Sequence, residues 1–396
     1  MLGWELPPHN SGGLGVVCYQ LCKSLASLGA DIDFVLPYTA NHGIDFMKIL
    51  SVHPQSADQL KQAGIAYDSY RYIKETGEIE FTDLHGQSDM YENVVAGIAK
   101  KKAYNVIHAH DWMTFRAAMR AKEQANLPLV IHIHSIESDR AGGNHGNPLV
   151  REIEHTAMTL ADRIVAISEH SKQAIIREYH IPADKIEVAY NSIDIADTHP
   201  LDIDNAYKYL TQMKQQDYKV VVNIGRLTIQ KGLPNLLRAM QQVITFEPKT
   251  ILLIVGNGEQ LYELIDLASE LGISKNVLFA DFQRGKNWRD AFAVGDLFVM
   301  PSISEPFGLT PLEAIGYGTP VLISRQSGVS EVLKNCLKID FWDTNEMANQ
   351  IVSVIRHKSL RHELHSNSLA EYKQLSWGQT ANWLMNTYKR VGAGVA

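Results

Sequence analysis

The chain has 396 residues, with 37 Lys and Arg against 44 Asp and Glu, which gives a formal net charge of −7. This length predicts two domains, and a hydrophobic content of 45% is enough to bury their cores. The acidic balance argues against nucleic-acid binding, no apolar run is long enough for an integral membrane segment, and three cysteines exclude a disulfide framework. No secretory signal pattern is present at the N-terminus, so we expect a cytoplasmic protein.

Short apolar runs alternate with amphipathic stretches along most of the chain. In the first half the 3.6-residue periodicity predicts helices over residues 16–28 and 113–125. Apolar runs predict strands over residues 33–37, 106–110, 129–134 and 163–167, and then over 219–224, 250–255, 277–280, 297–301 and 320–324. This alternation, which restarts halfway, predicts an α/β protein with two Rossmann-like, doubly wound parallel sheets.

Turn-forming residues between Tyr190 and Asp217 mark the expected domain boundary. We therefore expect an N-terminal domain over residues 1–200 and a C-terminal domain over residues 201–375. An amphipathic helix is predicted from Ser376 to Val391. At the start of the chain only Met1–Glu5 precede the first turn, so the first strand is either very short or begins before the given sequence.

A glycine-rich turn at residues 10–15 leads directly into the first predicted helix. Without side chains, Gly13 and Gly15 let backbone N–H groups approach an anion, and the start of a helix carries a partial positive charge. The turn therefore suits a phosphate of a nucleotide-linked substrate. The alternative is an ordinary turn in which Ser11 caps the helix.

Two cations follow the first strand of the second half. Arg226 comes just after the strand, and Lys231 lies five residues further on, where a helix is expected to start. Cations at the carboxyl end of a parallel strand suit a pyrophosphate and can neutralise a leaving diphosphate in place of a metal. A solvated surface pair is the alternative.

The segment over residues 301–314 runs from a strand end through a loop into a helix. It places Glu305 in the loop and Glu313 inside the helix. Ionised carboxylates are hydrogen-bond acceptors only, so both suit pairs of sugar or ribose hydroxyls. A helix start also attracts carboxylates for structural reasons alone, so the spacing by itself is weak support for a site.

Two His-x-His pairs, His108 with His110 and His132 with His134, end neighbouring predicted strands. Residues i and i+2 share one face of a strand, so each pair can present two imidazoles together, as a metal site requires. The available third ligands are Asp111, Glu137 and Asp139. None is an obvious choice, so we expect no metal and instead a single histidine, His110, facing a substrate hydroxyl.

Two smaller clusters are interpreted as structural. Cys18 and Cys22 lie one helical turn apart and are expected to be core residues. Lys100–Lys102 are expected to form a solvated helix end, with a membrane-surface contact as the alternative.

In combination these segments resemble the retaining glycosyltransferases of family 4, which have the GT-B fold and include glycogen, starch and sucrose synthases. The resemblance covers nearly the whole chain. It rests on the glycine-rich loop, the sequences at 108–112, 225–232 and 255–258, and above all the Glu-x7-Glu motif from Glu305 to Glu313 with its continuation to Val321.

The resemblance implies two Rossmann-like domains with the active site in the cleft between them, and a final helix (within 376–396) that packs back on the first domain. Its catalytic group corresponds to His110, Arg226, Lys231 and Glu305. Its donor-binding group corresponds to Gly13, Gly15, Gly256, Asn257, Gln283, Phe307, Gly308, Leu309 and Glu313. In this assignment Arg226 and Lys231 bind the diphosphate, Glu305 and His110 contact the sugar, and Glu313 holds the ribose.

The implied reaction moves a hexose, with glucose as the first candidate, to a hydroxyl of a sugar or glucan with retention of configuration. The implied donor is UDP-glucose or ADP-glucose, and no metal or other cofactor is expected. The polar residues Ser135, Glu137, Asp139 and Arg140 are expected on the acceptor side. Two alternatives remain open: a hexosyltransferase acting on a lipid or polysaccharide precursor at a membrane surface, and a catalytically silent nucleotide-sugar-binding protein.

Two positions depart from the family pattern. Asn10 replaces a Lys that glucan synthases usually carry, which weakens a glucan synthase assignment. Ser192 replaces a Gly at the domain junction, which would cost about 1 kcal/mol if φ were positive there.

Overall fold

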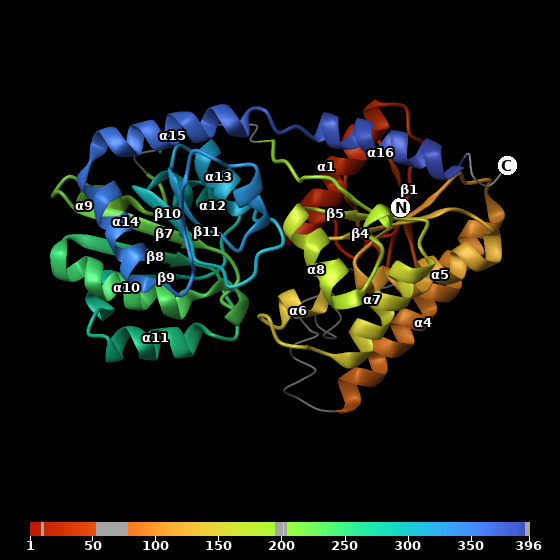
Figure 1. Ribbon diagram of the computed structural model, residues 1–396, viewed down its shortest axis with the longest axis horizontal. Helices are drawn as coiled ribbons and strands as arrows, with labels where there is room; N and C mark the ends of the chain where they lie inside the picture. The colour runs from red at the N-terminus through yellow and green to blue at the C-terminus, as the bar shows by residue number, and fades with distance from the viewer. Residues whose placement is uncertain (9–11, 53–77, 195–200, 202–203, 393–396) are drawn as a thin grey trace. The chain divides into compact units, whose positions relative to one another are not determined.

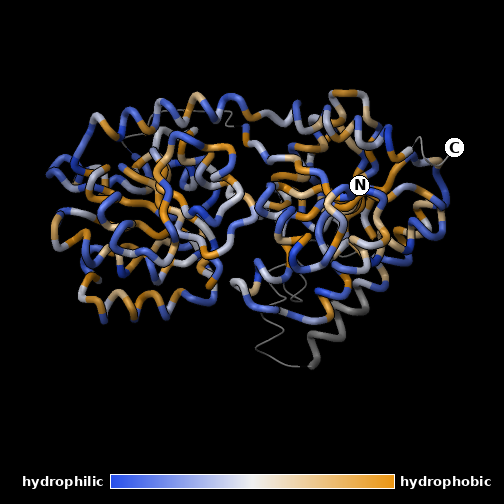
Figure 2. Tube along the Cα trace, viewed as in Figure 1, coloured by the Kyte–Doolittle hydropathy of each residue, from blue (hydrophilic) through white to orange (hydrophobic). Residues whose placement is uncertain are grey.

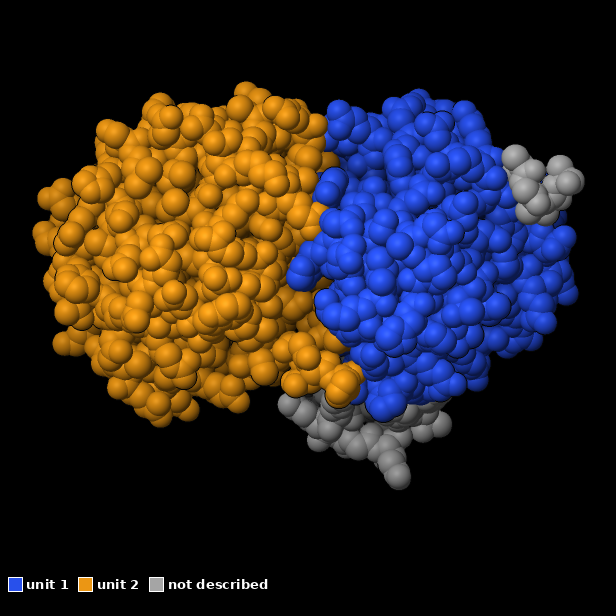
Figure 3. All heavy atoms as spheres, in the orientation of Figure 1, with its two compact units in different colours: residues 1–137, 146–191, 376–396 blue, residues 138–145, 192–375 orange. Residues whose placement is uncertain are grey.

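The computed structural model describes residues 1–8, 12–52, 78–194, 201 and 204–392, with the backbone alone for 78–87. The chain forms two compact units (Figure 3). Unit 1 comprises Met1–Glu137, Gly146–Asn191 and Ser376–Ala396, and unit 2 comprises Ser138–His145 and Ser192–Leu375. Each unit is an α/β structure built on a parallel sheet, as the alternation of apolar runs predicts.

The strands of unit 1 are β1 (Asp33–Leu36), β2 (Lys48–Ser51), β3 (Ile107–His110), β4 (Leu129–Ile133), β5 (Arg163–Ala166) and β6 (Ile186–Val188). Its helices are α1 (Gly13–Ser27), α4 (Glu78–Lys101), α5 (Trp112–Ala125), α7 (Pro148–Leu160), α8 (Glu169–Tyr179) and α16 (Trp377–Gly392), with a short 3-10 turn at Ala183–Lys185. Helix α6 (Glu137–Arg140) lies at the division between the units.

The first residues of the chain complete the sheet of unit 1. Leu2 forms parallel bridges to Val35 on β1 and to Ala109 on β3. Its N–H donates to the carbonyl of His108 at 2.8 Å, and its carbonyl accepts from the N–H of His110 at 3.1 Å. The spatial order is therefore β2-β1, the Leu2 segment, and β3-β4-β5-β6.

The strands of unit 2 are β7 (Lys219–Ile224), β8 (Thr250–Val255), β9 (Val277–Ala280), β10 (Leu297–Met300), β11 (Val321–Ser324) and β12 (Leu337–Ile339). Its helices are α9 (Lys208–Lys214), α10 (Leu233–Phe246), α11 (Leu261–Glu270), α12 (Gly285–Ala293), α13 (Thr310–Gly316), α14 (Thr344–Arg356) and α15 (Lys358–Tyr372). Short 3-10 turns lie at Ile229–Lys231, Ser274–Asn276 and Gly328–Glu331. The strand order β12-β11-β10-β7-β8-β9 is the Rossmann order, and every pair is parallel.

Burial on both faces explains the composition of these strands. All six residues of β8, Thr-Ile-Leu-Leu-Ile-Val, are buried, as expected for a parallel strand covered by helices on both sides. Helix α10 buries Leu233, Leu236, Leu237 and Met240 at helical spacing, and it packs against α14. In Figure 2 the hydrophobic segments gather at the sheets, with hydrophilic segments on the surrounding helices and loops.

Two structural expectations about individual residues are settled by the fold. Cys18 and Cys22 are fully buried on α1, and all three cysteines of the chain are unpaired. Ser192 is buried and is not among the residues with positive φ. The cost of a positive φ at this position therefore does not arise. Among the residues that the structure describes, no helix is both long and apolar enough to cross a membrane.

Candidate functional site

Lys231 and Glu305 form an ion pair at the carboxyl edge of the unit 2 sheet. The Lys231 Nζ lies 2.6 Å from the Glu305 Oε2, and both side chains are largely shielded from solvent, with exposed fractions of 22% and 11%. The hydroxyl of Ser302 donates to the same carboxylate oxygen at 3.1 Å. Sequence reasoning placed these two charges in separate motifs, and the structure brings them together. It also adds Ser302, which no spacing rule identified.

The loop that carries Glu305 is fixed by backbone hydrogen bonds on both sides. The Glu305 N–H donates to the carbonyl of Gln326, and the Glu305 carbonyl accepts from Gly328. Further along, the Val329 N–H donates to the Phe307 carbonyl at 2.7 Å. Glu305 as a whole residue, backbone included, is only 8% exposed. The carboxylate is therefore held in place by the fold before any substrate arrives.

Gly232 allows the Lys231 turn to fit against this loop. Its φ is +65°, and a Cβ at this position would lie 2.2 Å from the carbonyl oxygen of Pro301. The neighbouring backbone is joined across the same gap, because the Ile303 N–H donates to the Gln230 carbonyl at 2.9 Å. Only glycine combines this conformation with so close an approach of two backbones.

Glu313 lies on α13 and is positioned by a tryptophan. The indole Nε1 of Trp288, on α12, donates to the Glu313 Oε1 at 3.1 Å. Burial raises the pKa of the Glu313 carboxyl to about 7, which the hydrogen bond from Trp288 only partly offsets. The carboxyl is therefore a titratable acceptor near neutral pH. Trp288 was not singled out from the sequence, because a lone tryptophan on a helix carries no motif.

The turns after β8 and β9 hold the remaining donor-side residues together. Asn257 donates to the Asp281 carboxylate at 3.0 Å, and the Gln283 amide donates to the Asp281 carbonyl at 3.0 Å. Gly256 has a φ of +145° and passes against the backbone of Gly225. The two turns therefore form one hydrogen-bonded group at the same sheet edge as Lys231.

Arg226, Phe307, Gly308 and Leu309 complete the positions predicted in unit 2. Arg226 follows β7 and is exposed, whereas Phe307 and Gly308 are buried. Leu309 immediately precedes α13 and is partly buried. Their assigned roles toward a donor stay predictions.

In unit 1 the glycine-rich turn leads into α1 as predicted, with Gly13 as the first helical residue and Gly15 buried in the first turn. The residue at the N-cap position is Gly12, without a side-chain cap, rather than Ser11 as in the alternative interpretation of this turn. The Gly12 N–H donates to the Glu5 carboxylate at 3.2 Å. Asn10, like Ser11, lies outside the described residues.

The four histidines lie on one face of the unit 1 sheet, at the ends of β3 and β4. The register pairs His110 with His132, and His134 follows β4. Burial lowers the pKa values of all four imidazoles, so they are neutral at physiological pH. His110 has no solvent exposure, and its Nδ1 lies 3.0 Å from the His134 Nε2. Its expected contact with a sugar stays a prediction.

The three carboxylates considered as partners for these histidines have other roles. One Asp111 oxygen accepts the His134 N–H at 2.7 Å, and Glu137 accepts the Asn147 N–H at 2.8 Å. Asp139 accepts from the Ser304 hydroxyl at 2.6 Å. The group that does come together is His108, His110 and His132, whose ligand atoms lie within 4.8 Å of one another.

The four residues predicted on the acceptor side are divided between the units. Ser135 and Glu137 belong to unit 1, and Asp139 and Arg140 belong to unit 2. Glu137 is 3% exposed, and its carboxylate accepts a hydrogen bond from the Asn147 backbone N–H within the fold. Their role toward an acceptor stays a prediction.

The basic end of α4 is paired with acids. Lys102 forms ion pairs with Asp31 at 3.1 Å and with Asp33 at 3.3 Å. This arrangement fits the expected solvated helix end.

Two Rossmann-like units, one with a cation and carboxylates at the carboxyl edge of its sheet, form the architecture of the GT-B class of glycosyltransferases. Residues 11–197 match the model of the family described as Glycosyltransferase Family 4, and residues 211–370 match that of Glycosyl transferases group 1. The chain belongs to these glycosyltransferase families, as its motifs indicated.

Three proteins illustrate the similarity. The D-inositol 3-phosphate glycosyltransferase of Rhodococcus opacus is 29% identical over 96% of this chain and 86% of its own length. The sucrose-phosphate synthase structure from Thermosynechococcus elongatus superimposes with a TM-score of 0.77 at 19% identity, covering 99% of this chain and 98% of that one. Anabaena HepE in complex with UDP and glucose gives 0.72 at 21% identity, with 98% of both chains covered.

We expect replacement of Gly232 by Ala to destabilise unit 2 by about 1–3 kcal/mol more than replacement of Gly272. Both glycines have nearly the same φ, +65° and +70°, but a Cβ at Gly272 meets nothing within 4 Å. The matched pair therefore separates the backbone clash from the conformational cost, which is about 1 kcal/mol. Urea unfolding measures both. Equal losses would contradict the close approach to Pro301.

We expect Glu313→Gln to stabilise the fold more at pH 8 than at pH 5. Because the folded-state pKa is raised from 4.5 to about 7, the native state holds a proton that the unfolded state releases. Stability therefore falls as pH rises through this range, and Gln escapes the loss. The difference is on the order of 1–2 kcal/mol, since part of the side chain reaches solvent. Urea unfolding at both pH values, with the exposed Glu270→Gln as control, tests this; a pH-independent difference would refute it.

Proposed function

We propose that the protein transfers a hexose, with glucose as the first candidate, from a nucleoside diphosphate to a hydroxyl of a sugar, glucan or related polyol, with retention of anomeric configuration. The observation that carries this proposal is the Lys231–Glu305 pair at 2.6 Å, fixed at the carboxyl edge of a Rossmann-ordered sheet. Ligands of open parallel sheets bind outside this edge.

The pair supplies the two kinds of group that the reaction needs. A diphosphate leaving group gains negative charge as its bond to the anomeric carbon breaks, and a fixed cation such as Lys231 stabilises that charge. Arg226, which follows β7 at the same edge, adds a second cation. The Glu305 carboxylate can accept hydrogen bonds from sugar hydroxyls, because an ionised carboxylate has only acceptor sites.

A second carboxylate suits the nucleoside. Glu313 is oriented by the indole of Trp288, which leaves its other oxygen available for ribose hydroxyls. The group around Asn257, Asp281 and Gln283 lies after the next two strands of the sheet, where the base of the donor would be held.

The proposed transfer proceeds on one face of the sugar. The acceptor oxygen forms a bond to the anomeric carbon on the side from which the diphosphate departs, and the bond from that carbon to the diphosphate oxygen breaks. An oxygen of the departing diphosphate takes the acceptor proton. Configuration is retained, and no side chain becomes covalently attached.

The similar proteins favour a small hydroxylated acceptor. HepE is described with UDP and glucose, and two other relatives carry a phosphorylated polyol or sugar in their names. In this chain the three unpaired cysteines support placing the reaction in the reducing cytoplasm. A lipid-linked acceptor and a silent nucleotide-sugar binder are the outcomes that the assay must separate.

The test is release of free nucleotide by the purified chain from UDP-, ADP- and GDP-glucose, with and without sugars, glucans and phosphorylated polyols. We expect acceptor-dependent release, and product NMR should show the anomeric configuration of the donor. Lys231→Ala and Glu305→Ala should each lower transfer at least about 100-fold, because a transition-state charge or sugar contact is lost. The exposed Lys275→Ala is the control.

Circular dichroism must show that both variants keep the fold, since each leaves a shielded charge without its partner. Full activity in either variant would place the donor elsewhere. Donor binding without turnover for any acceptor would identify a silent binder, and turnover only on lipid vesicles would identify the membrane-surface enzyme.

We also expect transfer to continue in excess EDTA. Lys231 and Arg226 provide the positive charge that a divalent ion would otherwise supply at the diphosphate. Initial rates with EDTA and with added Mg²⁺ give the comparison. Loss of turnover that Mg²⁺ restores would overturn this part of the proposal.

A further inference from the structure

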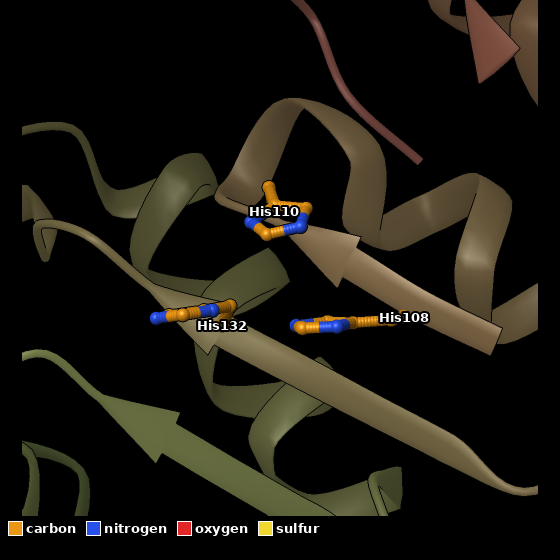
Figure 4. A group of neighbouring side chains, drawn as sticks. All are labelled: His108, His110 and His132. Carbon is orange, nitrogen blue, oxygen red and sulfur yellow. The ribbon is translucent and has the colours of Figure 1, made fainter. Parts of the chain in front are cut away.

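The histidines of unit 1 occupy positions where a buried parallel sheet normally has apolar side chains. Along β3 and β4 the residues Ala109 and Ile131 belong to the hydrophobic core on one face. Because side chains alternate, His108, His110 and His132 point to the other face. All three are at most 1% exposed. Figure 4 shows the three rings side by side, from two neighbouring strands.

Four of the six ring nitrogens of these three histidines lack hydrogen-bond partners. Among the described residues, the Nε2 atoms of His108 and His110 and both ring nitrogens of His132 are buried without a hydrogen bond. An unsatisfied buried polar atom destabilises the fold, so four of them on one sheet face require an explanation. One bound cation would satisfy several of these atoms at once.

The partners that do exist favour metal-binding tautomers. The His108 Nδ1 lies 2.5 Å from the hydroxyl of Tyr388 on α16, and the His110 Nδ1 lies 3.0 Å from the His134 Nε2. When each Nδ1 carries the proton and donates a hydrogen bond to that neighbour, the Nε2 lone pair is left for a bond to a metal ion. Metal-bound histidines regularly donate their second ring N–H in this way.

We propose that the Nε2 atoms of His108 and His110 and one ring nitrogen of His132 form a buried site for a divalent transition-metal ion, with Zn²⁺ as the first candidate. Neutral imidazole is a preferred ligand of zinc, and three protein ligands leave the fourth tetrahedral position for water. Calcium and magnesium are disfavoured, because they require oxygen ligands.

Binding of an ion requires the three side chains to rotate. The ligand atoms lie within 4.8 Å of one another, and the rings of His108 and His132 are nearly parallel at 6°. Nitrogens that share a tetrahedral zinc at about 2.0–2.1 Å lie about 3.3 Å apart. Side-chain rotations that bring the atoms closer by up to about 1.5 Å therefore complete the site.

This inference does not rest on the proposed function. The site lies wholly in unit 1, whereas Lys231 and Glu305 lie in unit 2. Bound zinc would occupy the Nε2 of His110, the residue that the family resemblance assigns to the sugar. Zinc is therefore expected to slow transfer, and chelation is expected to restore it while lowering the stability of unit 1.

The test is equilibrium dialysis of the full chain against Zn²⁺ with metal analysis. We expect the chain to bind one ion. Zn²⁺ should raise the melting temperature, and EDTA should return it to the value of the metal-free chain. The His132→Gln variant should not bind this ion. His155→Gln, an exposed histidine on α7, is the matched control and should bind as the unaltered chain does. Equal uptake by the two variants, or no uptake by the unaltered chain, would overturn the proposal.

A second measurement does not depend on the variant folding. In chain labelled with ¹⁵N-histidine, Zn²⁺ should shift the ring-nitrogen signals of three of the 16 histidines, with a stoichiometry of one ion. Co²⁺ in the same site should give the visible absorption of a four-coordinate ion. Zinc that shifts only signals of exposed histidines would refute a buried site.

Discussion

The parallel direction of all strands in unit 2 is the constraint from which its site follows. Every strand delivers its carboxyl end to one edge of the sheet, so turns that are far apart in the sequence meet there. Lys231 follows β7 and Glu305 follows β10, two strands that are direct neighbours although 74 residues separate the charges. Their ion pair is therefore a product of the topology, and the short loops only adjust its geometry.

Most of the architecture follows from local sequence patterns. The strands β7, β8 and β9 have the predicted bounds, because each is a compact apolar run between clear turns. The missed strands β2, β6 and β12 have only three or four residues and are partly exposed, so no apolar run distinguishes them. Their assignment depends on pairing with neighbours rather than on composition.

The residues of the candidate site were harder to predict from local sequence patterns than the strands. Glu305, Glu313 and Lys231 could be named because their spacing matches a family motif, but the partners Ser302 and Trp288 belong to no motif. For the histidines, the pattern showed two imidazoles on each strand, whereas the third ligand came from the neighbouring strand. Strand register, which pairs His110 with His132, is a tertiary property that spacing along one strand does not contain.

Helix α16 belongs to unit 1 but follows all of unit 2 in the chain. It packs against α1 and brings Tyr388 to His108. On the ribosome, the sheet of unit 1 is made first, yet the contact of Tyr388 with His108 can form only after the entire second unit has been synthesised. The half that begins first is thus completed last.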